Sequence, residues 1–265
     1  MAERSLRIDL AGRTAVVTGG GRGIGAATGR VLAGAGATVV LAARSTDEIE
    51  GVAQEIRDAG GEALAVRCDV TDPASIAGLR ATAEERYSRV DILVSNAGVA
   101  TSAPLGRTSL EEWQRLFAVN ATGAFLCARE FSPGMIGRRW GRIVHVASIA
   151  GLTAMPYISA YASTKHALVG LTRALAAEMA EHGVTVNAVC PGFVDTAMTD
   201  ESIERVTAKT GMSADKARAR LVALNPQGRL IESDEVAFLV AMLCDDRARG
   251  VNGQALAVDG GAFLG

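Results

Sequence analysis

Short, continuously apolar runs alternate along the chain with longer segments in which apolar residues recur at helical spacing. The runs that read as strands occupy residues 13–19, 37–44, 62–70, 90–98, 141–148, 184–192 and 254–261. They are bounded by turn residues and are too short for most helices. Continuous rather than alternating hydrophobicity is typical of parallel strands that are buried on both faces.

The spacing predicts helices between these strands. They are expected at residues 24–35, 46–59, 73–87, 109–131, from about 158, at 201–223 and at 233–244. Strands that alternate with helices predict an α/β fold, a Rossmann-like doubly wound parallel sheet with helices on both faces. No linker, repeat or low-complexity segment divides the chain. We therefore expect a single domain over residues 1–265, with a helical insertion at about 193–232 that would form a substrate lid.

Composition and charge narrow the class of protein. The chain has 265 residues, is 49% hydrophobic and has a formal net charge of −2. This charge gives no electrostatic basis for binding nucleic acid or an anionic membrane. The segment 143–164 has no formal charge but includes His145, Pro156 and several hydroxyls, which is unsuitable for a membrane span. The charged N-terminal residues do not form a signal peptide, so we expect a cytoplasmic protein.

The four cysteines, Cys68, Cys127, Cys190 and Cys244, are scattered and form no CxxC pattern. We expect reduced thiols and no metal site. The three histidines, His145, His166 and His182, are interpreted as structural or surface residues.

A glycine-rich loop, TGGGRGIG at residues 18–25, follows the first strand and opens the first helix. Glycines permit a tight turn and close approach of a pyrophosphate, while the helix N-terminus favours its negative charge. A packing turn is the alternative, but the order strand, glycines, helix favours a dinucleotide site. The candidate residues of this loop are Thr18, Gly19, Gly21, Arg22, Gly23, Ile24 and Gly25.

The end of the second strand indicates which nucleotide binds. An acidic residue there would hold the ribose 2′-hydroxyl of NAD, whereas this chain has Arg44 and Ser45. With Arg22 in the glycine loop, two guanidiniums suit a 2′-phosphate, so NADP(H) is the preferred cofactor. NAD(H) stays possible if both arginines are merely solvated. Further along, Asp69 and Val70 are positioned to flank the adenine, and the run Asn96, Ala97 and Gly98 permits close approach of the cofactor.

Tyr161 and Lys165 are four residues apart on a predicted helix and therefore share a face. A nearby ammonium is expected to lower the tyrosine pKa, which suits a general acid/base. Ser148 ends the fifth strand and could donate to a carbonyl oxygen. Tyr157 follows Pro156, so we expect it in the loop or first turn, where it would shape the substrate pocket.

Together these motifs resemble the classical short-chain dehydrogenase/reductase family over essentially the whole chain. The matching positions are Thr18, Gly19, Gly23, Gly25, Asn96, Ala97, Gly98, Asn120, Ser148, Tyr161, Lys165, Pro191 and Gly192. Ser95 departs from the pattern, since many members have a second asparagine there. The resemblance implies that Tyr161 exchanges the substrate proton, that Lys165 lowers its pKa and binds the nicotinamide ribose, and that Ser148 positions the carbonyl.

The resemblance also implies that Asn120 holds a water that continues a proton relay, and that Val194 and Thr196 meet the nicotinamide carboxamide. It implies hydride transfer between the nicotinamide and a carbonyl carbon.

The substrate is open at this point. The sequence resembles 3-oxoacyl reductases, polyketide ketoreductases and 3-hydroxyacyl-type dehydrogenases, and a CoA or acyl-carrier thioester is one possible substrate form. The basic residues Lys209, Lys216, Arg218 and Arg220 could meet an anionic substrate or form a solvated lid face. Met155 and Met198 are candidates for an apolar pocket, with core packing as the alternative.

The first hypothesis is thus an NADP(H)-dependent ketoreductase. The alternatives are an NAD(H)-linked secondary-alcohol or hydroxyacid dehydrogenase and, more remotely, a nucleotide-binding regulatory protein without catalysis. A homotetramer or homodimer is implied by the resemblance.

Overall fold

A single parallel sheet runs through the computed structural model, which describes residues 7–263 apart from the side chain of Lys209. Its seven strands have the order β3-β2-β1-β4-β5-β6-β7. The strands are β1 Thr14–Thr18, β2 Thr38–Ala43, β3 Ala63–Arg67, β4 Ile92–Ser95, β5 Gly141–Val146, β6 Val184–Pro191 and β7 Ala255–Val258. The predicted α/β fold is confirmed, because a parallel doubly wound sheet with helices on both faces is what forms.

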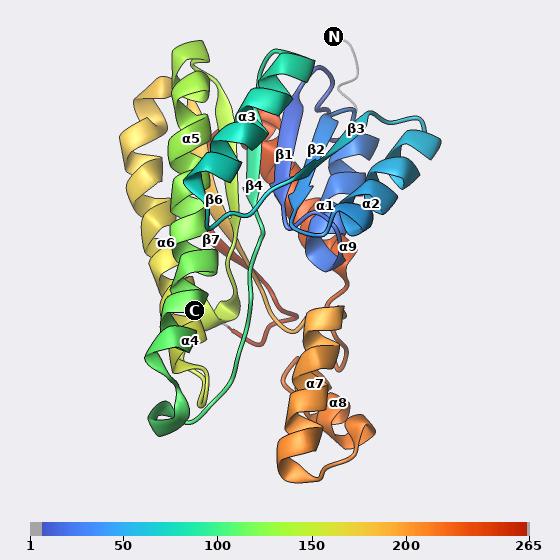
Figure 1. Ribbon diagram of the computed structural model, residues 1–265, viewed down its shortest axis with the longest axis vertical. Helices are drawn as coiled ribbons and strands as arrows, with labels where there is room; N and C mark the ends of the chain where they lie inside the picture. The colour runs from blue at the N-terminus through green and yellow to red at the C-terminus, as the bar shows by residue number, and fades with distance from the viewer. Residues whose placement is uncertain (1–6, 264–265) are drawn as a thin grey trace.

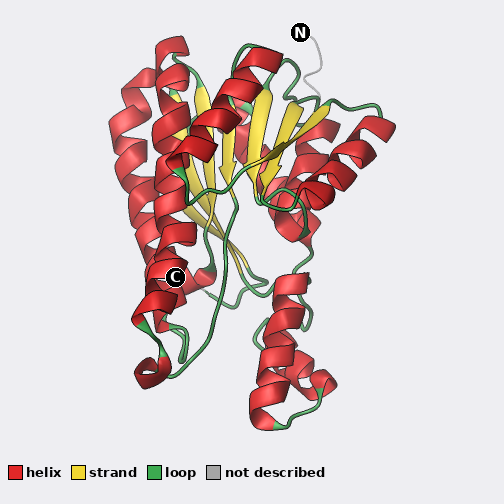
Figure 2. Cartoon of the chain, viewed as in Figure 1, coloured by secondary structure: helices red, strands yellow, loops and turns green. Residues whose placement is uncertain are grey.

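Helices flank the sheet on both sides (Figures 1 and 2). They are α1 Gly23–Gly34, α2 Thr46–Asp58, α3 Pro73–Tyr87, α4 Leu110–Phe117, α5 Gly123–Arg138, α6 Ser159–Met179, α7 Ala197–Thr210, α8 Ala214–Val222 and α9 Ser233–Cys244. Among the described residues, no helix is both long enough and apolar enough to cross a membrane.

The two largest apolar clusters lie on opposite faces of the sheet, and neighbouring strand residues contribute to different ones. Val17 and Ile92 pack with residues of α1, α2 and α9, whereas Val16 and Leu93 pack with residues of α3, α5 and α6. Successive side chains of a strand point to opposite faces, so a strand covered on both sides needs apolar residues throughout. This burial accounts for the continuously apolar runs in the sequence.

One helix predicted at 109–131 is built differently. The chain forms α4, then a π-helical segment Ala118–Thr122, then α5, which continues to Arg138. The prediction stopped before Pro133, which lies inside α5. Met135 is fully buried beyond that proline, and its packing in the core favours continuation of the helix. Arg139, with φ of +54°, ends it in the left-handed region.

The insertion after β6 forms two helices rather than one continuous segment at 201–223. α7 begins at Ala197 and ends before Gly211, whose φ of +68° breaks the helix. Ser213 then caps α8 by accepting a hydrogen bond from the Lys216 amide. Figure 1 shows α7 and α8 standing away from the sheet, beyond the carboxyl ends of its strands.

The sheet topology creates a crevice at those carboxyl ends. The chain passes outward from β1 to β2 and β3, then returns to place β4 on the other side of β1. Loops that follow β1 and β4 therefore leave in opposite directions, and such a switch point is where ligands bind in open parallel sheets.

Candidate active site

A cleft lies along the carboxyl ends of β1, β2, β3 and β4. The residues predicted from the sequence that line it are Gly19, Gly21, Arg22, Gly23, Ile24, Arg44, Ser45, Asp69, Val70, Asn96, Ala97, Gly98, Thr196 and Met198. The predicted residues that do not line this cleft are Thr18, Gly25, Asn120, Ser148, Met155, Tyr157, Tyr161, Lys165, Pro191, Gly192 and Val194. The cleft thus gathers residues from six separate stretches of the chain.

Sequence reasoning missed several lining residues, namely Ala42, Ala43, Glu48, Cys68, Val99, Val119 and Ala197. Most are immediate neighbours of predicted residues, and their small or apolar side chains have no recognisable pattern. Glu48 is different, because it lies one turn inside α2 and reaches back beside Gly21. The spacing of a helix from Ser45 would have been the signal for it.

The glycine loop has almost no room for side chains. A Cβ placed on Gly25 would lie 2.1 Å from the carbonyl oxygen of Gly19. Gly19 has a φ of +65°, and its Cβ would lie 2.9 Å from the Cα of Ala97. The loop is therefore packed directly on the segment that follows β4, and it exposes backbone rather than side chains to the cleft.

The side chains of Thr18 and Asn96 hold this loop in place through hydrogen bonds. The Asn96 amide Nδ2 donates to the carbonyl oxygens of Thr18 and Gly19, both at 3.0 Å. The Thr18 hydroxyl oxygen accepts from the backbone amides of Asn96 and Ala97, at 3.1 and 3.2 Å. Both side chains are used in positioning the loop, which explains why the predicted Thr18 does not line the cleft.

Charged side chains collect at the end of the cleft that is formed by β2 and β3. Arg22, Arg44, Glu48 and Asp69 all line it. Hydrogen bonds from Thr71, first from its backbone amide and then from its hydroxyl, lower the pKa of Asp69. Arg22 Nη1 lies 3.6 Å from Glu201 Oε1 of α7. The two guanidiniums expected from the sequence are present, but carboxylates accompany them.

Ser148, Tyr161 and Lys165 converge beside this cleft from β5 and α6. Ser148 follows β5 and caps a short 3₁₀ turn, where its hydroxyl accepts a hydrogen bond of 3.1 Å from the Ala150 amide. Tyr161 and Lys165 lie one turn apart on α6, with Lys165 Nζ 5.7 Å from the centre of the Tyr161 ring. A Cβ on Gly151 would lie 2.7 Å from the Lys165 carbonyl, so the turn after Ser148 packs tightly on α6.

The pKa of Tyr161 shifts in the direction opposite to the sequence expectation. Burial raises it, because the charged phenolate loses solvation, and hydrogen bonding with Ser148 only partly offsets this. Burial also lowers the pKa of Lys165 to about 8. The Lys165 ammonium donates to the carbonyl oxygen of Val146 at 3.0 Å. The expected lowering of the Tyr161 pKa is therefore wrong for this arrangement, because desolvation dominates and Ser148, rather than Lys165, is the group that opposes it.

Asn120 is fully buried in the π-helical segment, and its side chain makes three hydrogen bonds. Its Oδ1 accepts from the Val99 amide at 2.8 Å, and its Nδ2 donates to the Val99 carbonyl at 2.9 Å and to Thr164 Oγ1 at 3.0 Å. The Thr164 hydroxyl in turn donates to the Tyr161 carbonyl at 2.7 Å. Asn120 thereby connects the loop after β4 to the helix that carries Tyr161.

Tyr157 lies outside α6, as the sequence predicted, and its side chain is 65% exposed. It has a φ of +67°, which is unusual for a bulky residue, and its carbonyl accepts from the Ala103 amide at 2.8 Å. Met155 is partly exposed two residues earlier, and Met198 is 38% exposed at the start of α7. Tyr157 and Met155 therefore belong to one loop, whereas Met198 lies on the opposite, α7 side.

Within residues 7–263, no three His, Cys, Asp or Glu side chains come together as a possible metal site. All four cysteines are free and buried. Arg218 of the insertion pairs with Asp195 and Asp200 rather than standing free. The side chain of Lys209 lies outside the described part of the structure.

Comparisons with known proteins show the family of the chain. The family model described as short chain dehydrogenase matches residues 13–207. The chain is 42% identical to a cis-4-hydroxycyclohexanecarboxylate dehydrogenase of Sinomonas cyclohexanicum, over 95% of this chain and 97% of that one. It is 37% identical to a 3-oxoacyl-[acyl-carrier-protein] reductase of Synechocystis, over 96% of this chain and 98% of that one.

Among solved structures, a variant of actinorhodin polyketide ketoreductase with NADPH superposes with a TM-score of 0.91 and 38% identity. The superposition covers 94% of this chain and 97% of that one. Since the family model covers most of the chain and relatives of 37–42% identity match it over nearly its whole length, the chain belongs to the short-chain dehydrogenase family and is an oxidoreductase.

Proposed function

We propose that the protein is an NADP(H)-dependent ketoreductase that acts on a 3-oxoacyl or polyketide-type ketone. The observation that carries this proposal is the convergence of Ser148, Tyr161 and Lys165 beside the glycine-loop cleft. The similarity to a polyketide ketoreductase and a 3-oxoacyl reductase supports the substrate class. The substrate would be free or carried as a CoA or acyl-carrier thioester.

The cleft fits a dinucleotide. Its glycine loop offers backbone where a Cβ would clash, and Arg22, Arg44 and Ser45 offer donors for a 2′-phosphate. Asp69 and Val70 would flank the adenine, while Tyr161, Lys165, Val194 and Thr196 would hold the nicotinamide half. Pro191 and Gly192 would shape the turn that leads to these last two residues. When bound, the cofactor supplies or accepts the hydride.

The chain's own residues would move the proton. Because burial raises the pKa of Tyr161, its phenol keeps its proton at neutral pH and can donate it to a carbonyl oxygen. Ser148 would donate to the same oxygen and hold it in place. Lys165, with a pKa of about 8, and Asn120 would supply the route by which Tyr161 recovers a proton.

The insertion would act as the lid of a single domain, with Met155, Tyr157 and Met198 around the substrate. Two findings support this role: Thr196 and Met198 line the cleft, and α7 and α8 lie beyond the strand ends. We further propose a cytoplasmic homotetramer or homodimer in which α5 and α6 contribute to the interface.

A second candidate is an NAD(P)-linked dehydrogenase of a cyclic hydroxyacid. It is favoured by the 42% identity to cis-4-hydroxycyclohexanecarboxylate dehydrogenase. Glu48 in the cleft gives it some support, because a carboxylate near the adenosine ribose suits a free 2′-hydroxyl.

A substrate screen with both cofactors separates these candidates. We expect NADPH oxidation with acetoacetyl thioesters or bulky aryl ketones, and little oxidation with NADH. Tyr161→Phe should reduce turnover by about 10²–10⁴, as loss of a general acid does. Preferential use of NADH, or oxidation of cyclic hydroxyacids without reduction of any thioester, would contradict the first proposal.

A further inference from the structure

The first turn of α7 packs directly against the glycine loop. A Cβ on Gly23 would lie only 3.1 Å from Cγ2 of Thr196, the residue before α7. Thr196, Ala197 and Met198 all line the same cleft as Arg22. The start of the lid therefore forms one wall of the nucleotide cleft.

Glu201 lies just beyond the residues that line the cleft, on the same helix face as Ala197, which it follows by four residues. Its Oε1 lies 3.6 Å from Arg22 Nη1, and its Oε2 lies 3.9 Å from Arg205 Nη1. The carboxylate thus lies between a guanidinium of the cofactor loop and one of the lid itself.

Both members of the Arg22 and Glu201 pair are exposed, 61% for the Arg22 side chain and 48% for that of Glu201. Exposed ion pairs at such a distance are weak and exchange partners easily. A phosphate has more negative charge than a carboxylate and accepts two hydrogen bonds from a guanidinium. Glu201 would keep Arg205 as its partner after losing Arg22.

We propose that Glu201 is a specificity-determining residue, which competes with the 2′-phosphate of the cofactor for Arg22. This inference rests on the proposed use of NADP(H). The carboxylate weakens binding of a 2′-phosphorylated nucleotide and leaves binding of an unphosphorylated one unaffected. Each 2′-phosphate that binds also removes a contact between the lid and the glycine loop.

Binding of adenosine 2′,5′-bisphosphate and of adenosine 5′-monophosphate, measured by calorimetry without substrate or turnover, tests the proposal. Glu201→Gln should bind the bisphosphate roughly two- to five-fold more tightly at low salt, the range expected for an exposed ion pair, and bind the monophosphate unchanged. The gain should shrink as salt is added. Glu204→Gln is the matched control, because it removes the same charge from an exposed position on α7.

The double variant Arg22→Gln/Glu201→Gln shows whether the effect passes through Arg22. We expect Glu201→Gln to change nothing once Arg22 is Gln. An equal gain in Glu204→Gln, an equal gain for both ligands, or a gain that persists without Arg22 would each overturn the proposal. A wild-type protein that binds both ligands equally would contradict the NADP(H) preference instead, since the competition is read from the change in the ratio.

Discussion

His145 lies fully buried on β5 and has different surroundings at its two ring nitrogens. Nδ1 is 2.9 Å from Thr172 Oγ1, and the Thr172 hydroxyl donates to the Leu168 carbonyl at 2.8 Å. Because a hydroxyl has one proton, the Thr172 oxygen must accept from Nδ1–H, which defines a neutral tautomer. Nε2 has no partner among the described residues, and neither has the buried hydroxyl of Ser95, its register neighbour on β4.

This environment predicts a stability that depends on pH. Burial, and to a lesser degree Lys165, lowers the pKa of His145 from 6.5 to about 4. The unfolded chain then takes up a proton near pH 6.5 while the folded protein does not, so stability decreases as pH falls from 6.5 toward 4. The loss approaches about 3 kcal/mol, at about 1.4 kcal/mol per pKa unit. Chemical denaturation at several pH values measures it.

His145→Asn should reduce that slope between pH 6.5 and 4. His166→Asn is the control, because His166 is exposed on α6 and its replacement should leave the slope in place. If both variants keep the wild-type slope, the loss of stability at low pH arises from other groups.

Tyr157 and Tyr161 should respond differently to loss of the hydroxyl. Tyr157 is exposed and lies outside α6, whereas Tyr161 is on the helix beside Ser148 and Lys165. We expect Tyr157→Phe to change KM and substrate preference while preserving most of kcat. Steady-state kinetics of both variants on one substrate checks this. A fall in kcat as large as that of Tyr161→Phe would assign Tyr157 to the proton transfer.

For single residues, the sequence predicted which side chains form the site better than it predicted their ionisation. The spacing of Tyr161 and Lys165 indicated their proximity correctly. The direction of the Tyr161 pKa shift was wrong because it depends on burial, and burial depends on packing by residues far away in the chain. Glu201 was missed for a similar reason, since its proximity to Arg22 arises only in the folded chain, where α7 lies beside the glycine loop.

Among the elements, the strand–loop–helix unit from β1 to α1 has the least tolerance for added atoms. Gly25→Ala would place a methyl group 2.1 Å from the Gly19 carbonyl and 2.5 Å from Asn96 Nδ2. We expect a cost of about 1–3 kcal/mol from overpacking and at least about tenfold weaker binding of adenosine 2′,5′-bisphosphate. Thermal unfolding and calorimetry measure the two effects.

Gly34→Ala is the matched control on the same helix. Gly34 ends α1, and nothing lies within 4 Å of the Cβ that alanine would add. This variant should be neutral or slightly more stable, and should bind the nucleotide normally. If both variants behave alike, helix propensity rather than the loop contact decides the outcome.

The centres of the helices and strands follow from the sequence, but several of their ends do not. The third strand was predicted at 62–70 and ends at Arg67. The residues in excess, Cys68, Asp69 and Val70, line the cleft instead. In the sequence, residues at the end of a strand look the same whether they continue the strand pairing or leave the sheet to line a cleft. Gly211 similarly gives no hint in isolation that it separates α7 from α8.

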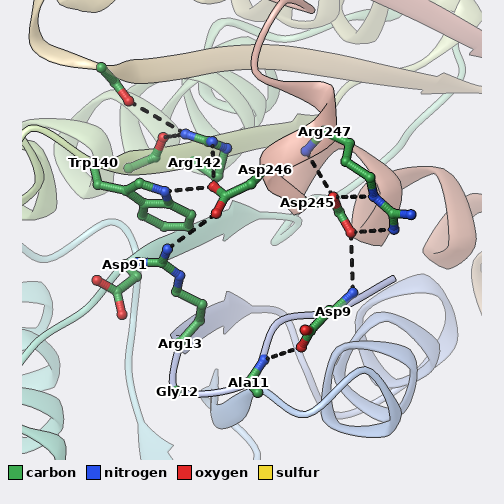
Figure 3. Close-up of polar contacts among 12 residues, drawn as sticks. Asp9, Ala11, Gly12, Arg13, Asp91, Trp140, Arg142, Asp245, Asp246 and Arg247 are labelled. Atoms are coloured by element: carbon green, nitrogen blue, oxygen red, sulfur yellow. Dashed lines mark hydrogen bonds and ion pairs between the residues drawn. The ribbon is translucent and has the colours of Figure 1, made fainter. Parts of the chain in front are cut away.

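At the scale of the whole molecule, the turn after α9 ties together distant parts of the chain (Figure 3). Asp245 Oδ2 accepts from the Asp9 amide at 3.1 Å. Asp246 Oδ1 accepts from Trp140 Nε1 at 2.8 Å and from Arg142 Nη2 at 3.1 Å. This cluster joins the segment before β1, the start of β5 and the end of α9 at the edge of the sheet opposite the cleft.

Asp246→Asn should destabilise the protein without changing nucleotide binding. Arg142 is only 3% exposed, and burial already lowers its pKa, so the charge of Asp246 compensates a buried guanidinium. We expect a loss of about 1–3 kcal/mol, because the amide can still accept the hydrogen bond but no longer offsets the charge of the buried guanidinium. Denaturant unfolding measures this loss.

Asp58→Asn provides the comparison, because Asp58 is exposed at the end of α2 and an asparagine there can still accept the hydrogen bond from Gln54. It should change stability by less than about 0.5 kcal/mol. Equal losses in the two variants would show that net charge, rather than the Arg142 contact, is responsible.

The topology was predictable at this scale because strands and helices alternate, and right-handed crossovers leave few arrangements. The Asp245 and Asp246 contacts were not, since they join residues 104 to 236 positions apart and involve residue types that are common on any surface.

The π-helical segment accommodates one extra residue between α4 and α5, and so sets the direction in which Asn120 points. Each residue of an α-helix turns by about 100°, and a π-helical segment holds an additional residue within its turn. Deletion of one residue there would make α4 and α5 one regular helix with nearly the same relative rotation, and would redistribute the remaining residues of the segment around the helix axis. Asn120 would then no longer face Val99 and Thr164. The length of the π-helical segment, more than any one side chain, therefore determines whether Asn120 faces the helix that carries Tyr161.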